Sequence, residues 1–177
     1  MRKGFVSTLI IGGIIHLVRA GIEFLNPVYW DPSTWFDYSA VILTTLQEIL
    51  FALVLLFMLR LAPPLKGIMA KIWRLVITVA ILGSFISGVG NLLEDAFRLS
   101  EIGNFMFSYG GLGGGIGLML TFFSALTLSE IRGRWSWFYI VPLLAVIFFS
   151  DYGGFITGLG LIILSISENR NNHLGSR

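Results

Sequence analysis

The residues best suited to chemistry in this sequence are charged side chains that interrupt long apolar runs. The stretch G-V-G-N-L-L-E-D-A-F-R at 88–98 ends one such run with Asn91, Glu94, Asp95 and Arg98 on one stripe of a helix. Ionisable side chains at membrane depth are costly, so they are candidates for functional residues. We interpret this stretch as one wall of a site rather than as a plain helix end.

Other apolar runs carry similar groups. His16, Arg19 and Glu23 are spaced three and four residues apart, which puts them on one helical face. Arg19 and Glu23 have the spacing of an ion pair within a helix. Glu48 interrupts the next run along the chain. Because such groups are strongly penalised when they face lipid, we expect them to face one another or water.

We predict that these side chains form one acidic, ligand-binding pocket in the outer half of a membrane. Its excess of carboxylates suits a small cationic solute, a metal ion or a proton. The sequence identifies no catalytic residue, no cofactor and no particular metal. The predicted ligand-binding residues are His16, Arg19, Glu23, Glu48, Asn91, Glu94, Asp95, Tyr109 and Asp151.

The composition fixes the class of protein that holds this site. Hydrophobic residues make up 55% of the 177 residues and charged residues only 12%, against about 25% charged residues in ordinary soluble domains. The chain is therefore predicted to be an integral membrane protein whose first partner is the lipid bilayer. The absence of cysteine excludes disulfides and thiolate metal sites. Its basic residues lie in short loops rather than on one face, so nucleic acid is not a predicted partner.

The apolar runs predict an all-α, polytopic membrane protein. A spanning helix needs about 20 apolar residues, and the runs at 5–25, 39–61, 72–93 and 105–129 are long enough. Residues 135–167 are too long for one helix, and Asp151-Tyr152-Gly153-Gly154 at their centre is typical of a turn. We expect two short spans there and six in total; the alternative is five, with a long, kinked last helix.

The basic residues favour the six-span threading with both termini in the cytoplasm. It places every Lys and Arg except Arg19 and Arg98 on the inner side, as basic residues in membrane proteins prefer. We predict a multi-pass protein of the plasma membrane with one transmembrane domain, 1–168, and a flexible polar cytoplasmic tail, 169–177. Asp31 and Asp37 are expected in a solvated outer loop.

Glycines are concentrated at 109–117, which reads Y-G-G-L-G-G-G-I-G. Neither phosphate-binding glycine motif is present. The repeated GxxxG spacing instead predicts a helix face that neighbouring helices approach closely.

Three functions follow from these features. The preferred one is binding or transport of the small cation. The second is an accessory subunit that packs through its glycine faces against another membrane protein or a second copy of itself. The third is an intramembrane enzyme acting on a lipid or isoprenoid, with Glu94 or Asp95 as general base and His16 assisting. A structural alternative to all three is that the polar groups only hold the helices together.

Overall fold

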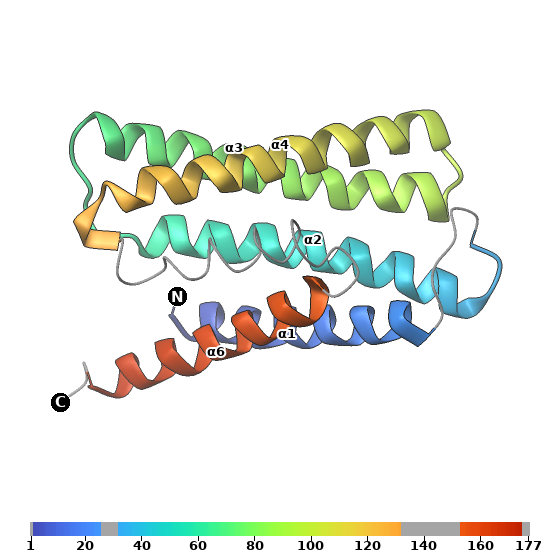
Figure 1. Cartoon of the computed structure of the whole chain (residues 1–177), viewed down its shortest axis with the longest axis horizontal. Helices are drawn as coiled ribbons and strands as arrows, with labels where there is room; N and C mark the ends of the chain where they lie inside the picture. Colours follow the sequence, from blue (N-terminus) through green and yellow to red (C-terminus); the bar gives the residue numbers. More distant parts are fainter. Residues whose placement is uncertain (1, 26–31, 132–152, 175–177) are drawn as a thin grey trace.

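The computed structural model describes residues 2–25, 32–131 and 153–174. The long elements in these ranges are all helices, which lie side by side along the long axis of the molecule (Figure 1). In chain order they are α1 (Arg2–Leu25), α2 (Trp35–Leu61), α3 (Ile68–Asn91), the π-helical turn η1 (Leu92–Ala96), α4 (Ser100–Leu126) and α6 (Gly153–Leu174).

Four stretches are long and apolar enough to cross a membrane. They are Lys3–Leu25, Trp35–Leu61, Ile68–Ala96 and Ser100–Leu126. These stretches coincide with the four predicted runs, which confirms the helical membrane architecture for this part of the chain. The predicted last hairpin lies partly in residues 132–152, outside the described residues, and α6 begins within its expected turn at Gly153.

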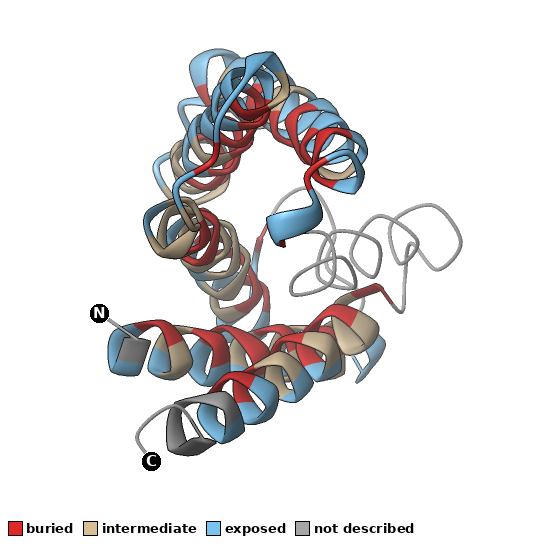
Figure 2. Cartoon of the chain, turned by 90° about the vertical axis from the view of Figure 1, so that its left-hand side faces the viewer, coloured by how far each residue is buried: buried red, intermediate tan, exposed pale blue. Residues whose placement is uncertain are grey.

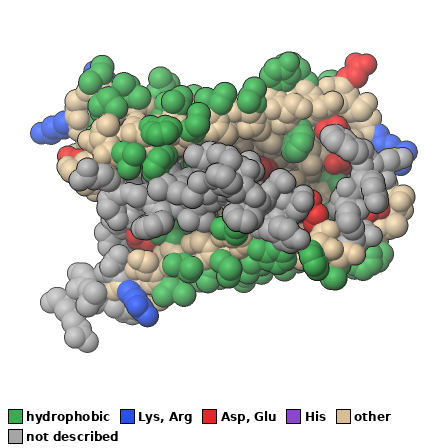
Figure 3. Space-filling model, in the orientation of Figure 1, with side chains coloured by type: hydrophobic (Ala, Val, Ile, Leu, Met, Phe, Trp, Pro, Cys, Tyr) green, Lys and Arg blue, Asp and Glu red, His purple; other side chains and the backbone are tan. Residues whose placement is uncertain are grey.

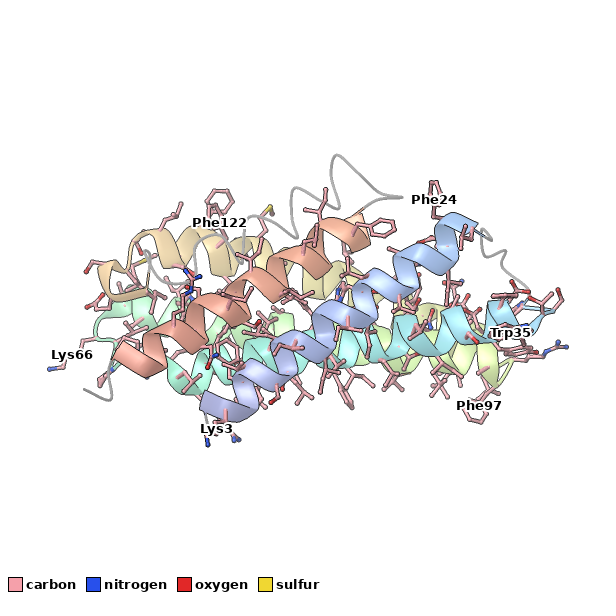
Figure 4. The ribbon with its side chains drawn as sticks, turned by 90° about the horizontal axis from the view of Figure 1, so that it is seen from below. Lys3, Phe24, Trp35, Lys66, Phe97 and Phe122 are labelled. Atoms are coloured by element: carbon pink, nitrogen blue, oxygen red, sulfur yellow. The ribbon has the colours of Figure 1, made fainter. Side chains whose placement is uncertain are left out.

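The outer surface of the helices is apolar. Ile11, Leu75 and Leu82 have half or more of their side-chain surface exposed, and hydrophobic side chains extend along the length of the molecule (Figure 3). Lys3 and Lys66 lie toward one end of the bundle, and Trp35 toward the other (Figure 4). A soluble monomer rarely exposes so much contiguous apolar surface, so lipid is the solvent that this surface fits.

Seen along the bundle, the helices follow one another in an arc, in the order α4, α3, α2, α1, α6 (Figure 2). Each helix packs on its neighbour in this order, and within the described ranges α4 and α6 do not pack on each other. The helix α6 runs antiparallel to α1: Gly154 lies against Ala20, and Leu161 against Gly12.

Glycine permits the tightest of these helix contacts, which joins α3 to α4. A Cβ atom on Gly83 would collide with the backbone of Gly114, and one on Gly117 would collide with Ala80. Small residues allow such backbone-to-backbone approach in membrane helices, where van der Waals contact replaces the hydrophobic effect. The α3–α4 pair is therefore held by its backbones rather than by interlocking side chains.

The start of α2 differs from the sequence prediction. Thr34 is its N-cap and accepts a hydrogen bond from the Asp37 amide, while the Asp37 carboxylate accepts one from the Thr34 amide at 2.8 Å. Asp37 is thus buried in a capping box rather than solvated in a loop. The helix begins four residues before the predicted span because this cap satisfies its first amide groups. Asp31 lies outside the described residues.

The last helix extends into the predicted polar tail. Residues 169–174 are helical, and α6 ends at Leu174. Polarity alone does not end a helix, and residues 169–174 contain neither glycine nor proline.

The α3–α4 contact yields a stability prediction. Gly83→Ala should lower the free energy of unfolding by about 1–3 kcal/mol, because overpacking forces the backbones apart. The measurement is thermal or denaturant unfolding in detergent micelles. In Gly21→Ala the new Cβ meets no described atom within 4 Å, so this control should be unchanged or up to about 1 kcal/mol more stable. Equal stability of the two variants would contradict the proposed role of the contact.

Candidate functional site

A cavity of about 230 Å³ lies between the helices of the arc. All five long helices contribute to its wall. The lining residues are His16 from α1, Gln47, Glu48 and Phe51 from α2, Ser84 from α3, Gly111, Gly114, Gly115 and Leu118 from α4, and Thr157 from α6.

Several residues that line the cavity lie near the middle of their helices. Glu48 lies thirteen residues from each end of α2, or roughly 20 Å at 1.5 Å per residue. Ser84 and Gly114 also lie near the middle of their spans. The sequence prediction counted depth from Ser39, whereas α2 begins a turn earlier at Trp35. The cavity therefore lies near the middle of α2, α3 and α4.

His16 is fixed by a hydrogen bond within its own helix. Its Nδ1 lies 2.8 Å from the Gly12 carbonyl oxygen, and the side chain is only 3% exposed. A carbonyl can only accept, so Nδ1 carries the hydrogen and donates. In the neutral ring this leaves the Nε2 lone pair as an acceptor, and no described group bonds to it. His16 thus presents an oriented base to the cavity.

Two adjacent residues of α2 add oxygen acceptors to the same wall. The Gln47 Oε1 atom is buried and has no hydrogen-bond partner in the described part of the chain. The Glu48 carboxyl group forms neither a hydrogen bond nor an ion pair with any described residue. Buried polar atoms usually have a partner, so the Gln47 oxygen is an exception, whereas the Glu48 side chain is half-buried.

Arg19 lies one turn along α1 from His16, and two of its N–H donors bind neighbouring side chains. Its guanidinium forms an ion pair with Glu23, and its Nε donates to the Thr44 hydroxyl at 3.2 Å. It also interacts electrostatically with Glu48. Arg19 and Glu23 therefore form a paired group beside the cavity rather than part of its lining.

The opposite wall of the cavity is apolar. Gly111, Gly114 and Gly115 expose the α4 backbone there, beside Leu118. The cavity thus has acceptors from α1 and α2 on one side and a smooth, side-chain-poor surface from α4 on the other.

Asn91 holds two helices together. It is buried, and its Nδ2 donates to the Val41 carbonyl and the Thr45 hydroxyl, each at 3.1 Å. Both hydrogens of its side-chain amide therefore bond to α2, and Asn91 does not line the cavity.

The other predicted residues also lie away from the cavity. Glu94 and Asp95 are half-buried on η1, and the Glu94 backbone packs on Gly103 at the start of α4. Tyr109 is 63% exposed and packs on Phe105, with ring centroids 4.6 Å apart. Asp151 lies outside the described residues. Of the nine predicted residues, the cavity brings together His16 and Glu48.

Sequence reasoning missed several lining residues. Gln47 and Ser84 are polar residues within apolar runs, and that signal could have identified them. Thr157 gives no such signal, because one threonine in a glycine-rich helix is unremarkable until α6 is placed beside α1. Gly111 and Gly115 cannot be told from their neighbours without knowing which face of α4 meets α3.

A metal centre has little support in this arrangement. In the described ranges no three His, Asp or Glu side chains come close enough to hold a metal ion, and protein metal sites usually use at least three protein ligands. Organic cations need fewer fixed ligands, because one carboxylate and a few neutral acceptors suffice.

Comparisons with known proteins add no further constraint, since no protein-family model, curated protein or solved structure matches this chain. The fold and composition define the class: a helical integral membrane protein with a cavity between its helices.

The Asn91 contacts can be tested by a double-mutant cycle. Asn91→Leu and Thr45→Val should each destabilise the protein, with a coupling of about 0.6 kcal/mol, the average for interhelical hydrogen bonds in a membrane. Unfolding in detergent measures the stabilities of the two single variants and the double variant. Strictly additive single effects would mean that the bond contributes nothing.

Proposed function

We propose that this protein binds a small organic cation, a protonated amine, in the cavity between His16 and Glu48. The observation that carries the proposal is the convergence of three acceptors without described partners, Glu48, Gln47 Oε1 and His16 Nε2, on one cavity near mid-membrane. The role of such a protein is transport or sensing of that solute.

The chemistry of these acceptors favours a cation that is also a hydrogen-bond donor. An ammonium group offers up to three N–H donors and one positive charge. One donor suits the Glu48 carboxylate, and the others suit Gln47 Oε1 and His16 Nε2. Glu48 forms no ion pair with a described residue, and a carboxylate at this depth is costly, so the ligand's charge adds to the compensation that Arg19 supplies. An anion is disfavoured because Arg19, the nearby cation, already binds Glu23 and Thr44.

The volume of the cavity limits the ligand. At about 230 Å³ it is smaller than the roughly 300–1,000 Å³ of pockets for drug-sized molecules. A ligand with few heavy atoms fits, whereas a phospholipid headgroup with its chains does not.

The other two functions have weaker support. The accessory-subunit hypothesis needs free glycine faces, but Gly83, Gly110, Gly117 and Gly158 are used in contacts within the chain. On α4, Gly113 and Gly115 meet no described atom, and Gly115 lines the cavity. The enzyme hypothesis pairs Glu94 or Asp95 with His16, but neither acid lines the cavity that His16 faces.

Ligand titration of the purified protein tests the proposal. Wild type should bind benzylammonium but not benzyl alcohol, its neutral analogue, in isothermal titration calorimetry. Glu48→Gln should weaken binding at least about tenfold, because a hydrogen bond to a charged group contributes about 1.5–3 kcal/mol, and 1.4 kcal/mol is tenfold.

Glu94→Gln is the matched control, since it removes a half-buried acid that does not line the cavity. It should bind like wild type. The proposal fails if wild type binds no small ammonium ion, or if Glu48→Gln binds as well as wild type.

We also propose that the chain crosses the plasma membrane six times, with both termini in the cytoplasm. Two observations support this threading. Lys3 and Lys66 lie toward one end of the bundle (Figure 4), which suits the inner side. The antiparallel packing of α6 on α1 directs its C-terminal end toward the same side.

Single-cysteine labelling tests this topology, because the native chain contains no cysteine. A membrane-impermeant maleimide on intact cells should label Ser100→Cys. Lys66→Cys and Asn169→Cys should react only after permeabilisation. Labelling of Asn169→Cys from outside would instead support the five-span alternative, and labelling of Lys66→Cys from outside would invert the orientation.

A further inference from the structure

In the described part of the chain, no packing contact explains why two of the glycines that line the cavity lack a side chain. A Cβ atom on Gly115 would meet no described atom within 4 Å, and one on Gly111 would lie 3.5 Å from the Ser87 hydroxyl, an ordinary van der Waals distance. By contrast, Gly110 and Gly117 on the same helix touch α3 so closely that a Cβ cannot fit. Glycine also weakens a helix by about 1 kcal/mol relative to alanine, so helix stability gives no reason for these two glycines.

The cavity offers a reason for glycine at positions 111 and 115. They are four residues apart, so they lie one above the other on a single face of α4, and Leu118 continues that face one turn later. Any side chain there would project into the 230 Å³ space. An independent feature indicates a ligand at the same place: His16, 3% exposed, presents the unbonded Nε2 from the facing wall.

The two walls differ in polarity. Glu48, Gln47 and His16 supply acceptors, whereas the glycine wall with Leu118 supplies a flat apolar surface. A ligand that satisfies both walls has an ammonium group at one end and an apolar body at the other. Hydrated alkali cations and compact ammonium ions satisfy only the first wall.

We propose that the ligand is a primary amine with a flat or branched apolar body, and that Gly111 and Gly115 set the largest body the site accepts. This inference rests on the proposed amine-binding function and adds the substrate class and the specificity determinants. The apolar body packs on the bare backbone of α4 while the ammonium group reaches Glu48.

Gly115→Ala and Gly113→Ala form the matched pair that tests this inference. Each is a glycine near the middle of α4 whose new Cβ meets no described atom within 4 Å, but only Gly115 lines the cavity. The probes are ethylammonium and benzylammonium, titrated calorimetrically into the purified full-length protein. Thermal unfolding without ligand checks that each variant is folded.

Gly115→Ala should weaken benzylammonium binding about tenfold or more, because one methyl group in a filled apolar pocket changes affinity by roughly 10- to 200-fold. Its affinity for ethylammonium should be nearly unchanged. Gly113→Ala should bind both probes like wild type. Gly111→Ala should repeat the Gly115→Ala pattern.

The outcomes separate the two proposals. If wild type binds neither ammonium ion, the amine-binding function itself is wrong. If wild type binds both, but Gly115→Ala weakens the two probes equally or not at all, the amine site stands and the glycine wall is not the determinant of ligand size. Equal losses in Gly113→Ala and Gly115→Ala also overturn the specificity role, because they indicate a general effect on α4.

Discussion

The backbone contact between α3 and α4 determines how the cavity is built. Gly110, Gly114 and Gly117 turn toward α3, where a Cβ would meet its backbone. Because successive helical residues are about 100° apart, the residues that follow them, Gly111, Gly115 and Leu118, form the adjacent face and line the cavity. The stretch at 109–117 therefore has two neighbouring faces, of which one sets the distance to α3 and the other sets the space for a ligand. A one-residue shift in this register would press Gly111, Gly115 and Leu118 onto α3.

The polar side chains within the bundle differ in how completely their hydrogen-bonding groups and charges are paired. Asn91 donates across the α2–α3 interface. Arg19 is paired with Glu23 and bonded to Thr44, so its charge is compensated between α1 and α2. His16 is only half satisfied, since Nδ1 is bonded to its own backbone. Packing interactions explain the first two cases. Packing interactions do not explain why His16 lies beside Gln47 and Glu48. This lack of a packing explanation distinguishes the residues of the candidate site from the other two cases.

The sequence predicted the four described spans well, because long apolar runs are unambiguous. The helix start at Trp35 was missed, although Thr34-Trp35-Phe36-Asp37 has the spacing of a capping box. His16 and Glu48 were recognisable because charge within an apolar run is unusual. The predicted grouping with Glu94, Asp95 and Tyr109 came from depth along each helix alone. Which face of a helix points inward depends on the neighbouring helices, and glycine-rich helices such as α4 give almost no amphipathic signal from which to read it.

The pairing of α6 with α1 has a consequence for how the protein matures. The helices α1 to α4 each pack on the next along the chain, so these contacts form as the spans emerge, whereas Gly13 of α1 packs on Gly158 of α6. In the described part of the chain, this face of α1 is therefore covered only after α6 has been made, and Thr157 joins the cavity wall at the same step. A chain that stops before α6 keeps the contacts among α1 to α4, but it lacks one wall of the cavity.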